Sequence, residues 1–122
     1  MCLRIDKLER VSVAKEDIVC YKILIRRKNG EYSTFYRDFV VDMGITYQSR
    51  LARLRCNNYD IIEQGLHVFV HKSDTLHFES KMDSTVRVVR CVIPKESLYY
   101  KGIFERCESY ASNHLRYEEI IT

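Results

Sequence analysis

The sequence has little of what marks several large classes of protein. It contains one proline, four glycines and no low-complexity stretch, while hydrophobic residues make up 46% of it, so it lacks the signature of a disordered chain. No apolar run reaches the roughly 18 residues of a membrane helix, and the first ten residues mix both charge signs where a signal peptide has an apolar stretch. We therefore expect a protein of the cytoplasm with no membrane partner.

Motifs for metal binding and catalysis are also missing. The five cysteines are widely spaced and never form a Cys-x-x-Cys pair, which predicts small buried side chains in a reducing compartment. Cys91 lies on an expected core strand, where burial raises a thiol pKa and weakens the nucleophile. No Gly-x-Ser-x-Gly, phosphate-binding loop or His-Glu-x-x-His is present. An enzyme is therefore the less favoured class, and we predict no cofactor.

Three histidines, His67, His71 and His77, lie within eleven residues. On one strand His67 and His71 would share a face but stand about 13 Å apart, at about 3.3 Å per residue, which is too far to hold one ion directly. The spacing predicts surface or half-buried histidines and no metal site.

What is present is typical of a single mainly β domain over residues 1–122. Alternating apolar residues predict a strand over 18–27, and Asn29-Gly30 predicts a hairpin into a returning strand over 31–36. Residues 46–56 alternate only partly, and Leu51 and Leu54 have a helical spacing. Further strands are expected over 39–41, 65–70, 85–93 and 115–121, with a short helix over 73–82. The fold class is α+β, mainly β: five to seven strands in a curved antiparallel sheet or partly open barrel, with one or two short helices.

Basic and aromatic residues are interleaved in the first half of the chain. Residues 21–60 carry eight basic and four acidic side chains, and rings beside cations are how single strands and nucleotides are held. Aromatic pairs that only stabilise the sheet are the alternative. The tyrosine-rich segment from Tyr99 to Tyr110 is either a recognition surface or a cover for the core. The candidate ligand-binding residues are Arg26, Arg27, Tyr32, Tyr36, Arg53 and His67.

Four short motifs carry a resemblance. In chain order they are Gly65-Leu66-His67-Val68-Phe69, Cys91-Val92-Ile93-Pro94-Lys95, Tyr99-Tyr100-Lys101-Gly102 and Tyr110-Ala111-Ser112. With these motifs the chain resembles, over residues 18–121, small uncharacterised proteins of gut bacteria and their phages. Glu96 departs from the pattern, which often has glycine there. The resemblance implies a phage or prophage setting and carries no activity.

A second resemblance is to degenerate ADP-ribosyltransferase-like domains, in which a Gly-x-His segment also lies on a strand. Here Gly65 and His67 match that segment, while Glu118 and Glu119 are the only glutamates placed to match a catalytic one. The chain shows no clear catalytic glutamate in the expected context.

These observations favour a non-enzymatic accessory binding protein, which captures a host protein or a signalling nucleotide and antagonises host defence in the host cytoplasm. The alternatives are a module that binds single-stranded nucleic acid and a nucleotide-acting transferase of the ADP-ribosyltransferase-like type. A homo-oligomer is compatible with each.

Overall fold

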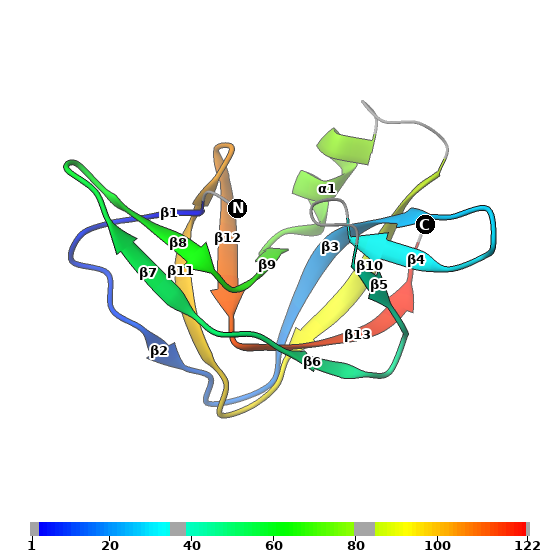
Figure 1. The fold of residues 1–122 in the computed structure, drawn as a ribbon, viewed down its shortest axis with the longest axis horizontal. Coiled ribbons are helices and arrows are strands. Elements are labelled where there is room, and N and C mark those ends of the chain that lie inside the picture. The colour runs from blue at the N-terminus through cyan, green and yellow to red at the C-terminus, as the bar shows by residue number, and fades with distance from the viewer. Residues whose placement is uncertain (1–2, 35–38, 80–84, 122) are drawn as a thin grey trace.

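The computed structural model describes residues 3–34, 39–79 and 85–121, whose path is drawn in Figure 1. These residues form thirteen strands and one helix. In chain order they are β1 (Leu3–Ile5), β2 (Ser12–Val13), β3 (Ile18–Arg26), β4 (Tyr32–Thr34), β5 (Val40–Val41), β6 (Thr46–Gln48), β7 (Ala52–Arg55), β8 (Asp60–Gln64), β9 (Leu66–Phe69), α1 (Lys72–Glu79), β10 (Val86–Ile93), β11 (Leu98–Phe104), β12 (Cys107–Ser112) and β13 (His114–Ile120). Within the same ranges, no helix has the length and apolar character needed to cross a bilayer.

The described strands belong to one antiparallel sheet. Its order is β6-β13-β10-β3-β9-β12-β11-β1-β8-β7, with β2 added to β11 and with β4 and β5 extending from β3. The sheet curls strongly into a half-barrel, as Figure 1 shows. The predicted class, a mainly β fold with a curved antiparallel sheet and a short helix, is confirmed. The predicted number of five to seven strands is wrong, because the described residues form thirteen.

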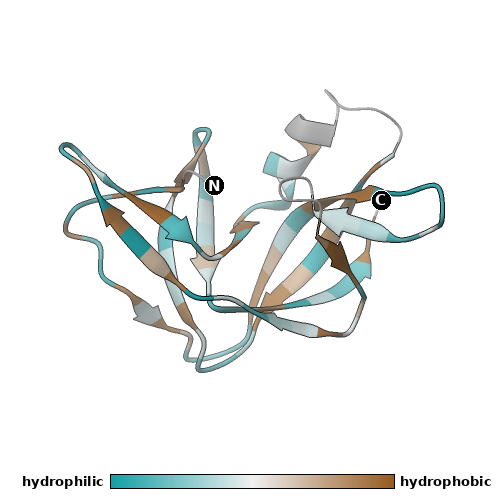
Figure 2. Ribbon diagram, in the orientation of Figure 1, coloured by the Kyte–Doolittle hydropathy of each residue, from teal (hydrophilic) through white to brown (hydrophobic). Residues whose placement is uncertain are grey.

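The central strand β3 is buried on both faces, and this produces two cores. On one face Cys20 and Leu24 belong to the first core, whose largest buried side chain is Tyr117 of β13. On the other face Ile23 packs in the second core with Phe69 and Phe104. The helix α1 packs against β3, β9 and β10. A strand that is buried on both sides loses the apolar–polar alternation of a half-exposed one, and Figure 2 shows hydrophobic residues along much of β3.

The predicted hairpin after β3 is confirmed. The Gly30 amide donates to the Arg27 carbonyl over 2.9 Å, and Gly30 has a φ of 88°, which costs glycine little. The return strand β4 begins at Tyr32, one residue after the start of the predicted range 31–36, and residues 35–38, which include the candidate Tyr36, lie outside the described residues.

Two regions differ from their sequence pattern. Residues 46–56 contain the strands β6 and β7; β7 has only four residues, and the helical spacing of Leu51 and Leu54 obscured its alternation. The register between β7 and β8 shifts at Ala52 and Arg53, where β8 carries one extra residue. The tyrosine-rich region is the hairpin of β11 and β12. Its turn residues Glu105 and Arg106 have φ values of 46° and 70°, so positive φ occurs here without the glycine or asparagine that usually signals it.

Candidate functional site

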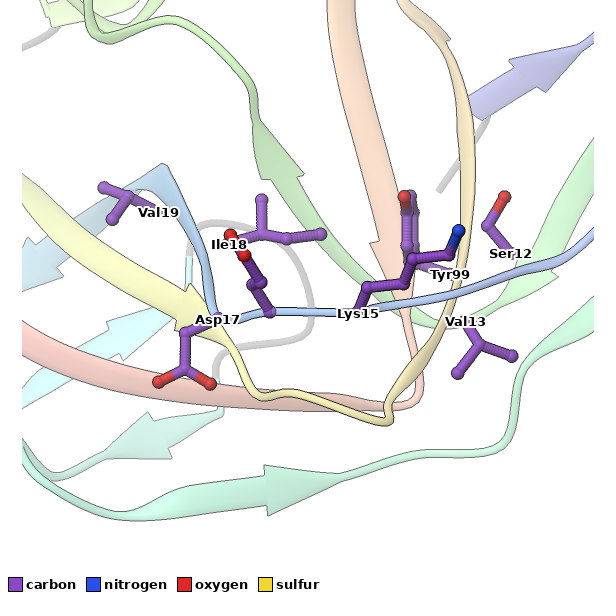
Figure 3. A pocket seen from close by; sticks show the side chains of 8 residues that line it. Ser12, Val13, Lys15, Asp17, Ile18, Val19 and Tyr99 are labelled. Carbon is purple, nitrogen blue, oxygen red and sulfur yellow. The ribbon is translucent and has the colours of Figure 1, made fainter.

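An open groove lies where the chain passes from β2 into β3. It is a shallow depression of about 1000 Å³, mostly open to solvent, and is lined by Ser12, Val13, Lys15, Glu16, Asp17, Ile18, Val19 and Tyr99. We call it the β2–β3 groove. Figure 3 shows Lys15 and Tyr99 projecting to the same side of the chain, with Asp17 on the opposite side. Its volume lies at the upper end of the range for ligand pockets.

The floor of the β2–β3 groove is held by hydrogen bonds to the turn after β10. The Ala14 amide donates to the Ser97 carbonyl over 2.8 Å, and the Glu96 amide donates to the Ala14 carbonyl over 2.7 Å. An Asp17 carboxylate oxygen accepts the Lys95 amide at 2.8 Å. Glu96 has a φ of 75°, in the region that favours glycine.

The lining of the groove is apolar and charged together. Val13 and Val19 are 55% and 51% exposed. The three successive charged residues Lys15, Glu16 and Asp17 are all exposed. Asp17 also lies 3.8 Å from the Arg116 guanidinium. Among the described residues, Lys15 and Glu16 have no ion-pair partner, so their charges face solvent. An apolar surface with a charged rim is the composition of a protein-binding site.

Three predicted ligand-binding residues lie together on the β3–β4 hairpin. Arg26 and Tyr32 are directly paired across the two strands. Arg26 is exposed, while Tyr32 is half-buried and packs against the first core. The Arg27 Nε donates to the Ser33 hydroxyl over 3.2 Å. Lys28 adds a third cation next to them, and Figure 2 shows a hydrophilic hairpin tip.

Arg53 lies far from that hairpin, at the other end of the sheet. Its Nε is 2.7 Å from Oδ2 of Asp60, whose carboxylate also contacts the Lys7 ammonium at 3.0 Å. The rest of the guanidinium donates to the main-chain carbonyls of Asp6, Lys7 and Glu9. Burial opposes the ionisation of Asp60, but hydrogen bonds from Lys7 and Arg53 outweigh it and lower its pKa to about 2. The donors of Arg53 are therefore occupied in holding the loop after β1.

His67 is half-buried and packs against the second core, away from both of these places. Its ring centroid is 4.6 Å from that of Phe104 and 4.9 Å from that of Phe69. Its Nε2 is buried and has no hydrogen-bond partner among the described residues. Burial, with the nearby charge of Lys22, holds the pKa of His67 well below its usual value. The Lys22 ammonium donates to the His67 carbonyl over 2.6 Å.

The remaining candidates for catalysis or metal binding are the cysteines and two glutamates near the end of the chain. Burial raises the pKa of Cys91 to about 12 and that of Cys20 still further. Over the described ranges, no three histidine, cysteine, aspartate or glutamate side chains converge on a point that would hold a metal ion. The glutamates considered for a transferase, Glu118 and Glu119, form ion pairs with Arg116 and Arg90. Two strands, β10 and β3, separate them from His67 on β9.

The five predicted ligand-binding residues that the structure describes therefore divide among separate places. Arg26, Arg27 and Tyr32 lie together, whereas Arg53 and His67 each lie elsewhere. The β2–β3 groove itself had one signal in the sequence, since Tyr99 belongs to the tyrosine-rich segment. The run Lys15-Glu16-Asp17 had none, because three charges before a strand are typical of any solvated loop.

Comparison with known proteins adds no relative. No family model matches the chain, and neither the curated proteins nor the solved structures gave a significant match.

Proposed function

We propose that this protein is a non-enzymatic binding protein that captures a segment of a partner protein in the β2–β3 groove. One observation carries the proposal. Val13 and Val19, each about half exposed, line one open groove together with Tyr99. Apolar surface gathered in a groove and rimmed by charge is a feature of protein-binding sites.

The charges of the groove favour a peptide over a nucleotide. Asp17 is compensated by Arg116, and the charges of Lys15 and Glu16 cancel, so the groove offers a phosphate no net positive charge. A segment that places an apolar side chain between Val13 and Val19, with a lysine or arginine next to Glu16, would satisfy both kinds of surface. The resemblance to small proteins of gut bacteria and their phages supports a host protein, such as a component of host defence in the bacterial cytoplasm, as this partner.

The test is selection of peptides from a random library on the purified protein. We expect enrichment of peptides with an apolar residue next to a basic one. The double change Val13→Ser with Val19→Ser should weaken the selected peptides about tenfold, because half-exposed valines contribute about 0.7 kcal/mol each when their remaining apolar area is buried, and about 1.4 kcal/mol is tenfold in affinity.

A change of charge at Glu16 tests the charge preference of the groove separately from its apolar requirement. Glu16→Lys should reverse the preference from basic to acidic peptides and leave the apolar requirement in place. The matched control is Glu31→Lys at the β3–β4 hairpin, which makes the same change in net charge at an exposed residue outside the groove. Selected peptides that bind all these variants with an unchanged dissociation constant would show that the groove is not the site.

Nucleotide or single-stranded nucleic-acid capture is the second candidate, on the β3–β4 hairpin. The observation that favours it is the direct pairing of exposed Arg26 with Tyr32, beside Arg27 and Lys28. Cations beside an aromatic ring hold phosphates and bases. A thermal-shift panel of nucleotides and short oligonucleotides tests it. Arg26→Ala with Arg27→Ala should abolish any shift, and oligonucleotide affinity should fall steeply with salt. Salt-insensitive binding, or binding that survives the double variant, would remove this candidate.

A further inference from the structure

The strand β7 ends the sheet and leaves one edge of its main chain unpaired. It is the last strand in the sheet order, and among the described strands it pairs with β8 alone. Among the described residues, Ala52–Arg55 make no main-chain hydrogen bond to any segment other than β8. An edge strand presents a row of free N–H and C=O groups, onto which another extended chain can add.

The edge is strongly basic. Residues 50–59 contain the three arginines Arg50, Arg53 and Arg55 and no acidic residue. Arg53 is neutralised by Asp60. Arg50 and Arg55 are exposed and, among the described residues, have no ion pair. Two uncompensated guanidinium groups therefore flank the free edge.

An apolar row reaches the same edge on the outer face of the sheet. Leu54 pairs with Ile61, Ile61 pairs with Arg4, and Arg4 pairs with Ile103. Their neighbours in sequence, Leu3, Ile5 and Ile62, point into the second core, so this row faces outward. Leu54 is 45% exposed and Ile103 is 37% exposed.

Tyr59 belongs to the same patch. It is 40% exposed, and its ring lies 5.1 Å from the Arg4 guanidinium. The outer row therefore runs from Ile103 through Arg4, beside the Tyr59 ring, to Ile61 and Leu54, and its apolar part ends at the edge. A strand added to β7 would extend this surface.

The alternation of β7 specifies the chemistry of that added strand. Leu54 points to the outer face, and Arg55, whose paired residue is the buried Asp60, lies on the opposite face. Since side chains alternate along a strand, the added strand would place apolar residues beside Leu54 and acidic residues beside Arg55. Directly opposed charges of opposite sign stabilise a strand pair, and like charges destabilise it.

The same rule disfavours a second copy of the chain. Two β7 strands paired edge to edge would bring the arginines of one copy against those of the other, which is how natural edges avoid self-association. We propose that the free edge of β7 is a docking site for an extended segment of a partner protein in which acidic and apolar residues alternate. This site is separate from the β2–β3 groove and does not depend on it.

The experiment measures fluorescence anisotropy with a labelled peptide that alternates valine with aspartate, at low salt, on the full chain. We expect saturable binding that weakens as salt rises, because ion pairs at an exposed edge are screened. A valine–lysine peptide should not bind. The valine–aspartate peptide methylated on alternate backbone nitrogens should lose at least tenfold in affinity, because it cannot donate to the main chain of β7.

Variants locate the site. Arg55→Glu should reduce affinity about tenfold, and Leu54→Ser should reduce it severalfold. Lys28→Glu, on the distant β3–β4 hairpin, makes the same change in net charge and should have less than a twofold effect. The groove variant Val13→Ser with Val19→Ser should also bind normally, so the two sites are tested independently.

Hydrogen exchange distinguishes strand addition from general charge attraction, because only an added strand would protect the main-chain amides of β7. The bound peptide should slow exchange of amides within Ala52–Arg55 and leave those of the β3–β4 hairpin unchanged. Binding of the methylated peptide with equal affinity, an equal loss in Lys28→Glu, or no protection of β7 would each overturn the proposal. Self-association of the free chain that Arg55→Glu does not alter would overturn the argument against a second copy.

Discussion

Replacing His67 should remove a large part of the acid sensitivity of the fold. Its imidazole is packed between Phe69 and Phe104 with a buried, unpartnered Nε2. Burial lowers the pKa of His67 well below the usual 6.5. Below that usual value the unfolded chain takes up a proton on this histidine and the folded chain does not. The free energy of unfolding must therefore fall as the pH falls.

The magnitude follows from the unfolded chain. Between pH 7.5 and pH 5.0, protonation of a histidine with a pKa of about 6.5 stabilises the unfolded state by up to about 2 kcal/mol, at about 1.4 kcal/mol per pH unit. The variants His67→Gln and His67→Phe cannot take up this proton. The free energy of unfolding falls between pH 7.5 and pH 5.0, and this fall should be smaller in each variant than in the wild type by up to about 2 kcal/mol.

Urea unfolding at several pH values measures this directly. The quantity compared is the change in unfolding free energy between pH 7.5 and 5.0, so contributions of other titrating groups cancel between wild type and variant. The absolute stability of each variant does not enter. Equal pH dependence in the wild type and both variants would show that His67 takes up its proton without unfolding and would refute the buried, neutral imidazole.

Three further predictions concern other sites. An added Cβ at Gly102 would lie 2.3 Å from the Arg4 carbonyl oxygen, about 1 Å inside ordinary contact, so Gly102→Ala should cost about 2–3 kcal/mol in urea unfolding. Gly65→Ala, whose nearest neighbours are side-chain atoms at 3.0 Å or more, should cost clearly less. Asp60 ionises with a pKa lowered from 3.8 to about 2, so its stabilisation is complete above pH 4 and is lost as the pH falls through about 2. Asp60→Asn should lower the urea midpoint at pH 7 and flatten acid unfolding between about pH 4 and 2; an unchanged midpoint would contradict the role given to its contacts. Cys20 and Cys91, both fully buried, should react with iodoacetamide only after denaturation, which mass spectrometry of the labelled peptides would show.

Local signals in the sequence were sufficient to predict an element where the residue types themselves determine the backbone conformation. Asn29-Gly30 predicted the hairpin, and the alternation through Ile23 and Ile25 predicted β3. The same alternation could not show that both faces of β3 are buried, because a second core depends on strands that follow much later in the chain. The strand β7 was hidden by its length of four residues and by the helical spacing of Leu51 and Leu54. The turn of β11 and β12 was hidden by Glu105 and Arg106, which adopt positive φ without a glycine.

The candidate site was less predictable than the fold. Residue type alone grouped Arg53 with Arg26 and Arg27. In the structure Arg53 is ion-paired with Asp60, and no pattern in the sequence predicts that contact. In the same way, His67 is an unremarkable histidine on a strand until two phenylalanines enclose it. The β2–β3 groove arises where residues 12–19 meet Tyr99. That meeting is a property of the sheet order, which a single sequence does not carry.

The pairing of the first strand with a late one has a consequence for synthesis of the chain. Arg4 of β1 lies opposite Ile61 of β8 on one side and Ile103 of β11 on the other, so a ribosome must add about 100 residues after the first strand before the second of its two partners exists. At about 5–20 residues per second this takes about 5–20 s. Throughout that interval Leu3 and Ile5 have no completed core to enter, and neither does Ile23 while β10 is absent. The apolar side chains of β1 and β3 therefore stay exposed until the last third of the chain has left the exit tunnel.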